Sequence, residues 1–309
     1  MSTAYMPIWT TPRRVALIAP AGRVDPTIHE ATLARLTTLG ITAVDGRWSH
    51  AQHRYMAGDI TTRLADFHAA FTQDDIDAVW CLRGGYGCAQ LIPHLDWGML
   101  RHVHPQRALI GYSDITALLH LFARHGRPAV HAPVATDVAR LSWPAPPDTP
   151  ATTALRSIDN ALTSPQGHLH AQHIAGPAHD VSGILLGGNL TTLASLCGTA
   201  AALTLDTPTL LMLEDINEPD YCLERCFYQL LHTLDIRLLR GVCLGSFTRN
   251  GRSVRKCHSM FAEWLRPLGI PLYSDLPFGH QADNQAWPCG VPATLSNKGL
   301  FWQRVSHIH

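Results

Sequence analysis

The chain has 309 residues, 46% of them apolar, which is enough for two domains with a sizeable buried core. It carries 24 basic and 24 acidic residues, so its net charge is zero, which argues against a nucleic-acid partner and against a polybasic membrane anchor. No apolar run has the length of a membrane span, so we expect no membrane partner.

Strands and helices are predicted to alternate along the first half of the chain. A buried strand over 14–19 ends in Pro-Ala-Gly, and Asp25-Pro26 then begins a helix that ends at Gly40. Further strands are predicted at 41–44, 76–82, 108–110 and 129–131, and further helices at 59–71 and 115–124. This alternation indicates βαβ units and a mostly parallel, flavodoxin- or Rossmann-like α/β sheet.

The composition changes between residues 141 and 166, where four prolines crowd together. We therefore predict a parallel α/β domain over 1–145, a linker over 146–174 with a short helix at 152–162, and a smaller β-rich domain over 175–309. In this second domain we expect buried strands at 181–186, 209–213 and 241–247, helices at 190–196 and 221–234, and short β-like pieces between 278 and 302.

The eight cysteines are scattered and form no Cys-x-x-Cys pair, and no HExxH motif is present. We therefore expect reduced thiols and neither a metal nor another cofactor. The N-terminal residues lack the basic and apolar regions of a secretory signal, so we expect the protein in the cytoplasm.

The turn Gly111-Tyr112-Ser113-Asp114 follows the strand at 108–110 directly and precedes an apolar helix. A sharp strand-to-helix turn can hold a serine hydroxyl clear of the backbone for nucleophilic attack and aim the Asp114 N–H at an oxyanion. The match is partial, because the second glycine of such a turn is replaced by Ile115. The alternative is that Ser113 or Asp114 only caps the helix.

Glycines also follow the strand at 76–82, in the run Arg83-Gly84-Gly85-Tyr86-Gly87. Their backbone N–H groups could face a ligand or supply a second oxyanion donor, and Arg83 could bind a substrate carboxylate. The run matches neither a P-loop nor GxGxxG, and an ordinary glycine-rich turn is an equal alternative.

Two further polar residues follow apolar segments of the second half. Glu214 comes after the strand at 209–213, with Asp215 as a rival, and His280 follows Phe278-Gly279. The order Ser113, Glu214, His280 is that of the α/β-hydrolase triads. From the residues alone, a solvated strand end and a structural histidine remain alternatives, since the chain has 19 histidines.

Taken together, these segments resemble the LD-carboxypeptidase family, the muramoyl-tetrapeptide carboxypeptidases of serine-peptidase type. The stretches that carry the resemblance are "WCLRGGYGCAQLIPHLDW" (80–97), "IGYSDITALL" (110–119), "GILLGGNLTTLASLCGT" (183–199), "LMLEDINEPDYCLERCF" (211–227) and "DLPFGHQADN" (275–284). The resemblance implies that Ser113 is the nucleophile, Glu214 the triad carboxylate and His280 the base.

The resemblance also implies a parallel α/β domain and a smaller β-rich domain with the site between them, in a cytoplasmic homodimer without a metal. The implied reaction is hydrolysis of the amide between a diamino acid and the terminal D-alanine of murein tetrapeptides, in cell-wall recycling. The N–H of Asp114 and a glycine N–H near Gly84–Gly85 would hold the oxyanion. Arg83 as a carboxylate clamp is our own hypothesis.

Two other functions remain open. Some members of the family are microcin-immunity peptidases that cleave peptide–nucleotide antibiotics, and Trp287 is a candidate to stack on such a base. The second alternative is a non-catalytic two-domain protein that binds a small ligand in its cleft and needs no reactive serine.

Overall fold

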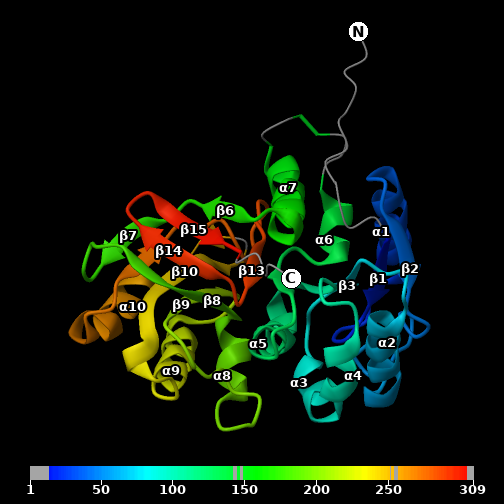
Figure 1. Cartoon of the computed structure of the whole chain (residues 1–309), viewed down its shortest axis with the longest axis horizontal. Helices are drawn as coiled ribbons and strands as arrows, with labels where there is room; N and C mark the ends of the chain where they lie inside the picture. Colours follow the sequence, from blue (N-terminus) through cyan, green and yellow to red (C-terminus); the bar gives the residue numbers. More distant parts are fainter. Residues whose placement is uncertain (1–13, 142–144, 147–148, 251, 254–256, 305–309) are drawn as a thin grey trace.

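The computed structural model describes residues 14–141, 145–146, 149–250, 252–253 and 257–304. Within these ranges two β-sheets lie side by side, with helices packed against them (Figure 1). This two-part α/β architecture confirms the fold class predicted from the sequence.

The first sheet has six strands in the order β13-β5-β4-β3-β1-β2, in which β1 to β5 are parallel and β13 is antiparallel to β5. The strands are β1 (Arg14–Ile18), β2 (Thr42–Asp45), β3 (Ala78–Cys81), β4 (Ala108–Gly111), β5 (Ala129–His131) and β13 (Trp287–Cys289). The order 2-1-3-4-5 is the flavodoxin-like order, in which ligands bind beyond the carboxyl ends of the strands.

Helices cover both faces of this sheet because its strands are apolar on both faces. In β1, Val15 and Leu17 pack into one hydrophobic cluster while Ala16 and Ile18 pack into another. The cluster of Val15 and Leu17 also contains residues of α1 (Pro26–Thr38), α6 (Ala135–Arg140) and α7 (Pro150–Thr163). The cluster of Ala16 and Ile18, on the other face, contains residues of α2 (Ile60–Thr72), α3 (Cys88–Leu91), α4 (Trp97–His102) and α5 (Thr116–Arg124).

Local sequence sets several helix boundaries. The Asp25 side chain accepts from Thr27 N at 2.9 Å, and Pro26 is the first residue of α1, as predicted. Helices α3, α4 and α6 are not predicted, because segments of four to six residues are too short to show a helical period.

The second sheet has nine strands, eight of them in the order β6-β15-β14-β8-β9-β10-β12-β7, with β11 paired to β10. Strands β8, β9, β10 and β12 are parallel neighbours, and the outer strands are antiparallel. The strands are β6 (Gln166–Leu169), β7 (Gln172–Ala175), β8 (Val181–Asn189), β9 (Thr209–Ile216), β10 (Leu239–Arg249), β11 (Arg252–Ser253), β12 (Leu272–Ser274), β14 (Pro292–Ser296) and β15 (Gly299–Gln303). Helices α8 (Leu190–Leu196), α9 (Asp220–Leu231) and α10 (Cys257–Leu265) pack on one face.

The predicted division into 1–145, 146–174 and 175–309 stays a prediction. In the structure the segment 146–174 contains α7, β6 and most of β7, and these two strands extend the second sheet. Strand β13, from the second half of the chain, joins the first sheet. The two sheets therefore exchange short segments on both sides of the predicted boundary.

Helix α5 lies between the two sheets (Figure 1). Leu118 and Phe122 of α5 belong to one continuous hydrophobic cluster with Leu185 of β8 and Met212 of β9. This packing fixes the turn that precedes α5 close to the carboxyl ends of β8 and β9.

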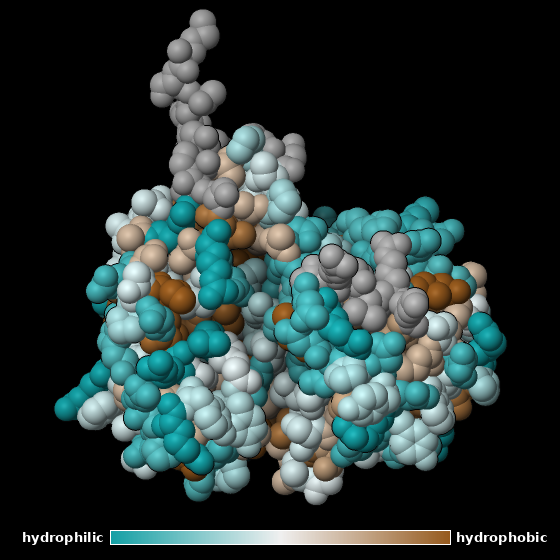
Figure 2. All heavy atoms as spheres, turned by 180° about the vertical axis from the view of Figure 1, so that it is seen from behind, coloured by the Kyte–Doolittle hydropathy of each residue, from teal (hydrophilic) through white to brown (hydrophobic). Residues whose placement is uncertain are grey.

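The surface seen in Figure 2, from the side opposite to Figure 1, is mostly hydrophilic, and its hydrophobic areas are small and separate. Across the part of the chain that the structure describes, every helix is either too short or too polar to cross a bilayer.

Candidate active site

Ser113 lies on a strained turn between β4 and α5. Its φ is +63°, a left-handed conformation that is uncommon for a residue with a side chain. No side chain caps the helical segments that follow the turn. The helix-cap alternative for Ser113 therefore has no support, and the strain is typical of a serine held for attack.

Asp114 ties this turn to the glycine-rich loop. Its buried carboxylate accepts a hydrogen bond from Cys88 N at 2.9 Å, and burial raises the pKa of Asp114. The buried Arg63 guanidinium holds the loop from the other side, donating to Gly87 O at 2.9 Å and Pro20 O at 2.7 Å. The loop is therefore fixed against the Ser113 turn by buried, charge-assisted hydrogen bonds.

Gly84 is the closest part of this loop to Ser113. A Cβ at position 84 would lie 2.9 Å from Ser113 Oγ and 3.4 Å from Asp114 N. Only glycine leaves this space open. Backbone of Gly84 therefore lies directly against the Ser113 hydroxyl, and N–H groups at such a position can face an oxyanion.

Glu214 and His280 are hydrogen-bonded to each other. His280 Nδ1 lies 2.6 Å from Glu214 Oε2, and the two side chains are 14% and 0% exposed. Burial alone would lower the pKa of His280, but the Glu214 carboxylate, together with Asp215 and Asp137, outweighs this and the pKa is raised above 6.5. Burial alone would raise the pKa of Glu214, but His280, together with His131 and Asn189, outweighs this, so the pKa is lowered.

Asp215, the rival of Glu214, has a different set of partners. Its carboxylate accepts from Asn189 Nδ2 at 3.1 Å and from both the backbone N and the hydroxyl of Thr191 at 2.8 Å. Burial, together with the nearby Glu214, raises the pKa of Asp215 to about 6. Asp215 thus holds the start of α8, while Glu214 faces the histidine.

Glycine makes the approach of His280 to Glu214 possible. Gly279 has φ +99°, and a Cβ there would come within 2.7 Å of Glu214 Cβ and of Ser246 Oγ. Any larger residue at position 279 would push the histidine loop away from β9.

The His280 ring lies beside the Ser113 turn. The rings of Tyr112 and His280 have centroids 4.7 Å apart, and Thr116 Oγ1 accepts from Asn189 N at 3.0 Å at the end of β8. The structure therefore brings residues from both halves of the chain together. No hydrogen bond joins Ser113 to His280 among the described residues. Catalytic hydrogen bonds often shorten only when substrate is bound.

Arg83 lies at the exposed start of the glycine loop. Its Nη1 donates to Arg23 O at 3.0 Å, which orients the guanidinium. Tyr86 of the same loop is 49% exposed and faces Tyr55, which is 56% exposed, at a ring separation of 6.3 Å. No local pattern in the sequence predicts this aromatic pair, because Tyr55 belongs to a different loop.

His131 is a second histidine near the pair, and no local pattern distinguishes it from the other histidines. It is fully buried, and neither ring nitrogen has a hydrogen-bond partner among the described residues. Burial lowers its pKa to about 4, so the ring is neutral at pH 7. Its ring stacks on Trp287 at 5.0 Å. Because Trp287 is fully buried, the idea that it stacks on a nucleobase is wrong.

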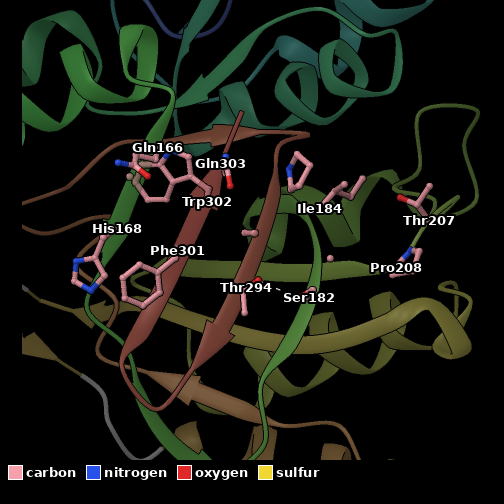
Figure 3. Close-up of a pocket in the computed structure, with 14 residues that line it drawn as sticks. Gln166, His168, Ser182, Ile184, Thr207, Pro208, Thr294, Phe301, Trp302 and Gln303 are labelled. Carbon is pink, nitrogen blue, oxygen red and sulfur yellow. Dashed lines mark hydrogen bonds between the residues drawn. The ribbon is translucent and has the colours of Figure 1, made fainter. Parts of the chain in front are cut away.

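A cavity of about 870 Å³ lies elsewhere, over β6, β15, β14 and β8 (Figure 3). The rings of His168 and Phe301 and the hydrogen-bonded pair Ser182 and Thr294 lie along it. Its lining contains no acidic, lysine or arginine side chain and none of the predicted catalytic residues. This cavity is therefore separate from the predicted catalytic residues.

Comparisons with known proteins agree along the chain. Residues 15–132 match the LD-carboxypeptidase N-terminal domain, and residues 182–295 match the LD-carboxypeptidase C-terminal domain. The chain is 46% identical to a murein tetrapeptide carboxypeptidase of Pseudomonas aeruginosa, over 94% of this chain and 95% of the relative.

Solved structures share the fold. A muramoyltetrapeptide carboxypeptidase from Oxalobacter formigenes superposes with a TM-score of 0.78 at 28% identity, covering 94% of this chain and 98% of the other. The microcin C7 self-immunity protein has a TM-score of 0.79 at 18% identity, covering 96% and 97%, which shows the fold alone. With both domains matched and a close relative along nearly its whole length, the chain belongs to the LD-carboxypeptidase family.

Proposed function

We propose that this protein is a serine LD-carboxypeptidase that removes the terminal D-alanine from murein tetrapeptides, as a step in cell-wall recycling. The observation that carries the proposal is the 2.6 Å hydrogen bond between His280 and Glu214 beside the strained Ser113 turn. The 46% identity to a murein tetrapeptide carboxypeptidase supports the substrate class.

In this proposal Ser113 Oγ attacks the carbonyl carbon of the amide before D-alanine, and His280 Nε2 takes the hydroxyl proton. Glu214 holds His280 in the tautomer with the proton on Nδ1 and stabilises the imidazolium that forms. The raised pKa of His280 and the lowered pKa of Glu214 are consistent with an ion pair at this stage.

The negative charge on the tetrahedral intermediate is held by the Asp114 N–H and a glycine N–H near Gly84–Gly85. The C–N bond then breaks, and His280 returns its proton to the leaving D-alanine. Water, activated by His280, attacks the acyl-Ser113 ester and releases the tripeptide. The mechanism uses no cofactor.

Arg83 binds the terminal carboxylate of the substrate in this proposal. It lies next to Gly84, and Arg23 O orients its guanidinium. Arg83→Ala should therefore raise KM by about tenfold or more, as expected for the loss of a charge-assisted hydrogen bond. An unchanged KM would remove Arg83 from the site.

We further propose that the protein acts in the cytoplasm as a homodimer, without nucleic-acid or membrane partners. The balanced charge supports only the absence of nucleic-acid and anionic-membrane partners. Equilibrium sedimentation of the untagged chain tests the dimer directly, and a single species at 33.9 kDa would exclude it.

The deciding experiment offers the purified protein a murein tetrapeptide and, separately, an aminoacyl-adenylate mimic. We expect release of D-alanine from the tetrapeptide, and loss of that release in Ser113→Ala. Cleavage of the mimic alone would favour the immunity-type activity, and cleavage of neither would reject the enzymatic proposal.

A further inference from the structure

Three potential metal ligands meet at the outer edge of the first sheet, away from Ser113. His29 lies on α1, Asp45 ends the edge strand β2, and His50 lies in the loop that follows. One ligand atom from each side chain lies within 4.8 Å of the others. Two imidazoles and one carboxylate form a set that suits divalent first-row transition metals.

The distance between the first two ligands already fits a shared ion. His29 Nε2 lies 2.9 Å from Asp45 Oδ1. With bonds of about 2.0–2.2 Å, two ligand atoms at right angles around a metal are about 2.9 Å apart, whereas tetrahedral ligands are about 3.4 Å apart. The pair therefore matches neighbouring corners of an octahedral or five-coordinate site.

The two imidazole rings are already in contact. Their centroids are 4.4 Å apart and their planes are at 89°. His50 is exposed, so rotation of its side chain can close the remaining gap between ligand atoms.

The surroundings favour binding from solvent. The His29 side chain is 2% exposed and hydrogen-bonded, the Asp45 side chain is 33% exposed, and His50 is exposed. The buried Asp66 carboxylate accepts from Trp48 N at 2.8 Å and so holds the turn that carries His50. Because His29 and the turn that carries His50 are already held in place, metal binding has to order fewer groups and loses less conformational entropy. Asp45 and His50 remain accessible to an ion from solvent.

We propose that His29, Asp45 and His50 bind one divalent transition-metal ion, such as Zn²⁺ or Co²⁺, and so fasten the loop after β2 to α1. In the bound form the neutral His29 carries its proton on Nδ1 and Nε2 ligates the metal, in place of the hydrogen bond to Asp45. The other coordination positions face solvent and take water.

The fastened loop reaches toward the glycine-rich loop through backbone contacts. Ala57 N donates to Ala21 O at 3.0 Å, and Gly22 N donates to Gly84 O at 3.0 Å. The ion therefore orders a segment that supports the wall of the candidate active site. The metal site does not depend on the proposed function, because its ligands are separate from Ser113, Glu214 and His280.

The test uses the untagged full chain after chelator treatment, titrated with Zn²⁺ and Co²⁺ by calorimetry. His50→Ala and Asp45→Asn remove one ligand each, and His102→Ala, an exposed histidine of α4, is the matched control. We expect the wild type and the control to bind one ion that the two ligand variants bind at least tenfold more weakly. The Co²⁺ complex should show the weak visible bands of five- or six-coordinate cobalt.

Equal stoichiometry and affinity in the wild type and both ligand variants would overturn the proposal, because the ion would then lie among the other histidines or cysteines. Absence of saturable binding to the wild type would also overturn it. His50→Ala changes only an exposed side chain, so it remains informative if Asp45→Asn folds poorly. Zn²⁺ should also raise the Tm of the wild type and the control but not that of His50→Ala.

Discussion

Replacing Glu214 by glutamine tests the proposed triad most directly. The substitution keeps the shape of a fully buried side chain and removes only its charge. It acts at the 2.6 Å contact with His280 Nδ1. A glutamine amide can also donate to Nδ1 and so select the tautomer that cannot act as a base toward Ser113.

The size of the effect follows from the charge that is lost. At an effective dielectric constant of about 20, two unit charges about 4 Å apart attract by about 4 kcal/mol, which corresponds to about 10³-fold in rate. If His280 also takes the wrong tautomer, kcat falls further. The equivalent change in a serine-protease triad costs about 10⁴-fold in kcat. We therefore expect Glu214→Gln to lower kcat by about 10³–10⁴-fold.

The pH profile gives a second measurement on the same variant. His280 must be neutral to accept a proton, so kcat/KM falls as the pH drops through its pKa. Because Glu214 raises that pKa above 6.5, the acid limb of the wild type should lie above pH 6.5. In Glu214→Gln the strongest attraction is lost while burial and the weaker effects of Asp215 and Asp137 remain, so the acid limb should move to lower pH.

The assay is D-alanine release from tetrapeptide over a pH series, and Asp215→Asn is the matched control. This neighbouring buried carboxylate holds Asn189 and Thr191, so its loss should lower the Tm while kcat falls less than tenfold. A Glu214→Gln enzyme with near-normal kcat and an unmoved acid limb would refute the assigned role of Glu214.

Further predictions concern glycine and serine backbone positions. Gly279→Ala should lower kcat strongly, because the new Cβ would come within 2.7 Å of Glu214 Cβ. Gly126 is the matched control, since it also has a positive φ but open space around it. Gly126→Ala should cost only about 1 kcal/mol of stability and leave kcat unchanged. Equal kcat in the two variants would argue against the close approach. Ser113→Gly should be inactive yet more stable than Ser113→Ala by up to about 1 kcal/mol, seen as a higher Tm, because glycine adopts φ +63° without strain. Equal Tm values would mean that the turn stores no strain.

Much of the fold could be read from local patterns. Apolar runs predict the strands of the first sheet, and Asp25-Pro26 predicts the start of α1, because a strand period and an N-cap are properties of neighbouring residues. The resemblance to the LD-carboxypeptidase family, carried by five stretches, predicts the family that the domain matches then show. Residues 1–13 and 305–309 of the predicted domains lie outside the described residues.

Other features depend on segments far apart in the chain. The contact between Tyr55 and Tyr86 and the cluster of His29, Asp45 and His50 join separate loops, and no local spacing encodes them. The absence of HExxH led us to expect no metal, yet a ligand set can also assemble from a helix, a strand end and a loop.

The sequence by itself determined that a serine follows β4 on a tight turn, that glycines follow β3, and that two acids end β9. The family resemblance implies Glu214 as the triad carboxylate, and the tertiary structure gives the physical reason why Glu214, and not Asp215, faces the histidine. Successive side chains of a strand point to opposite faces, so Glu214 and Asp215 must diverge. The loop that carries His280 passes over the Glu214 side, while α8 begins on the other side, against Asp215.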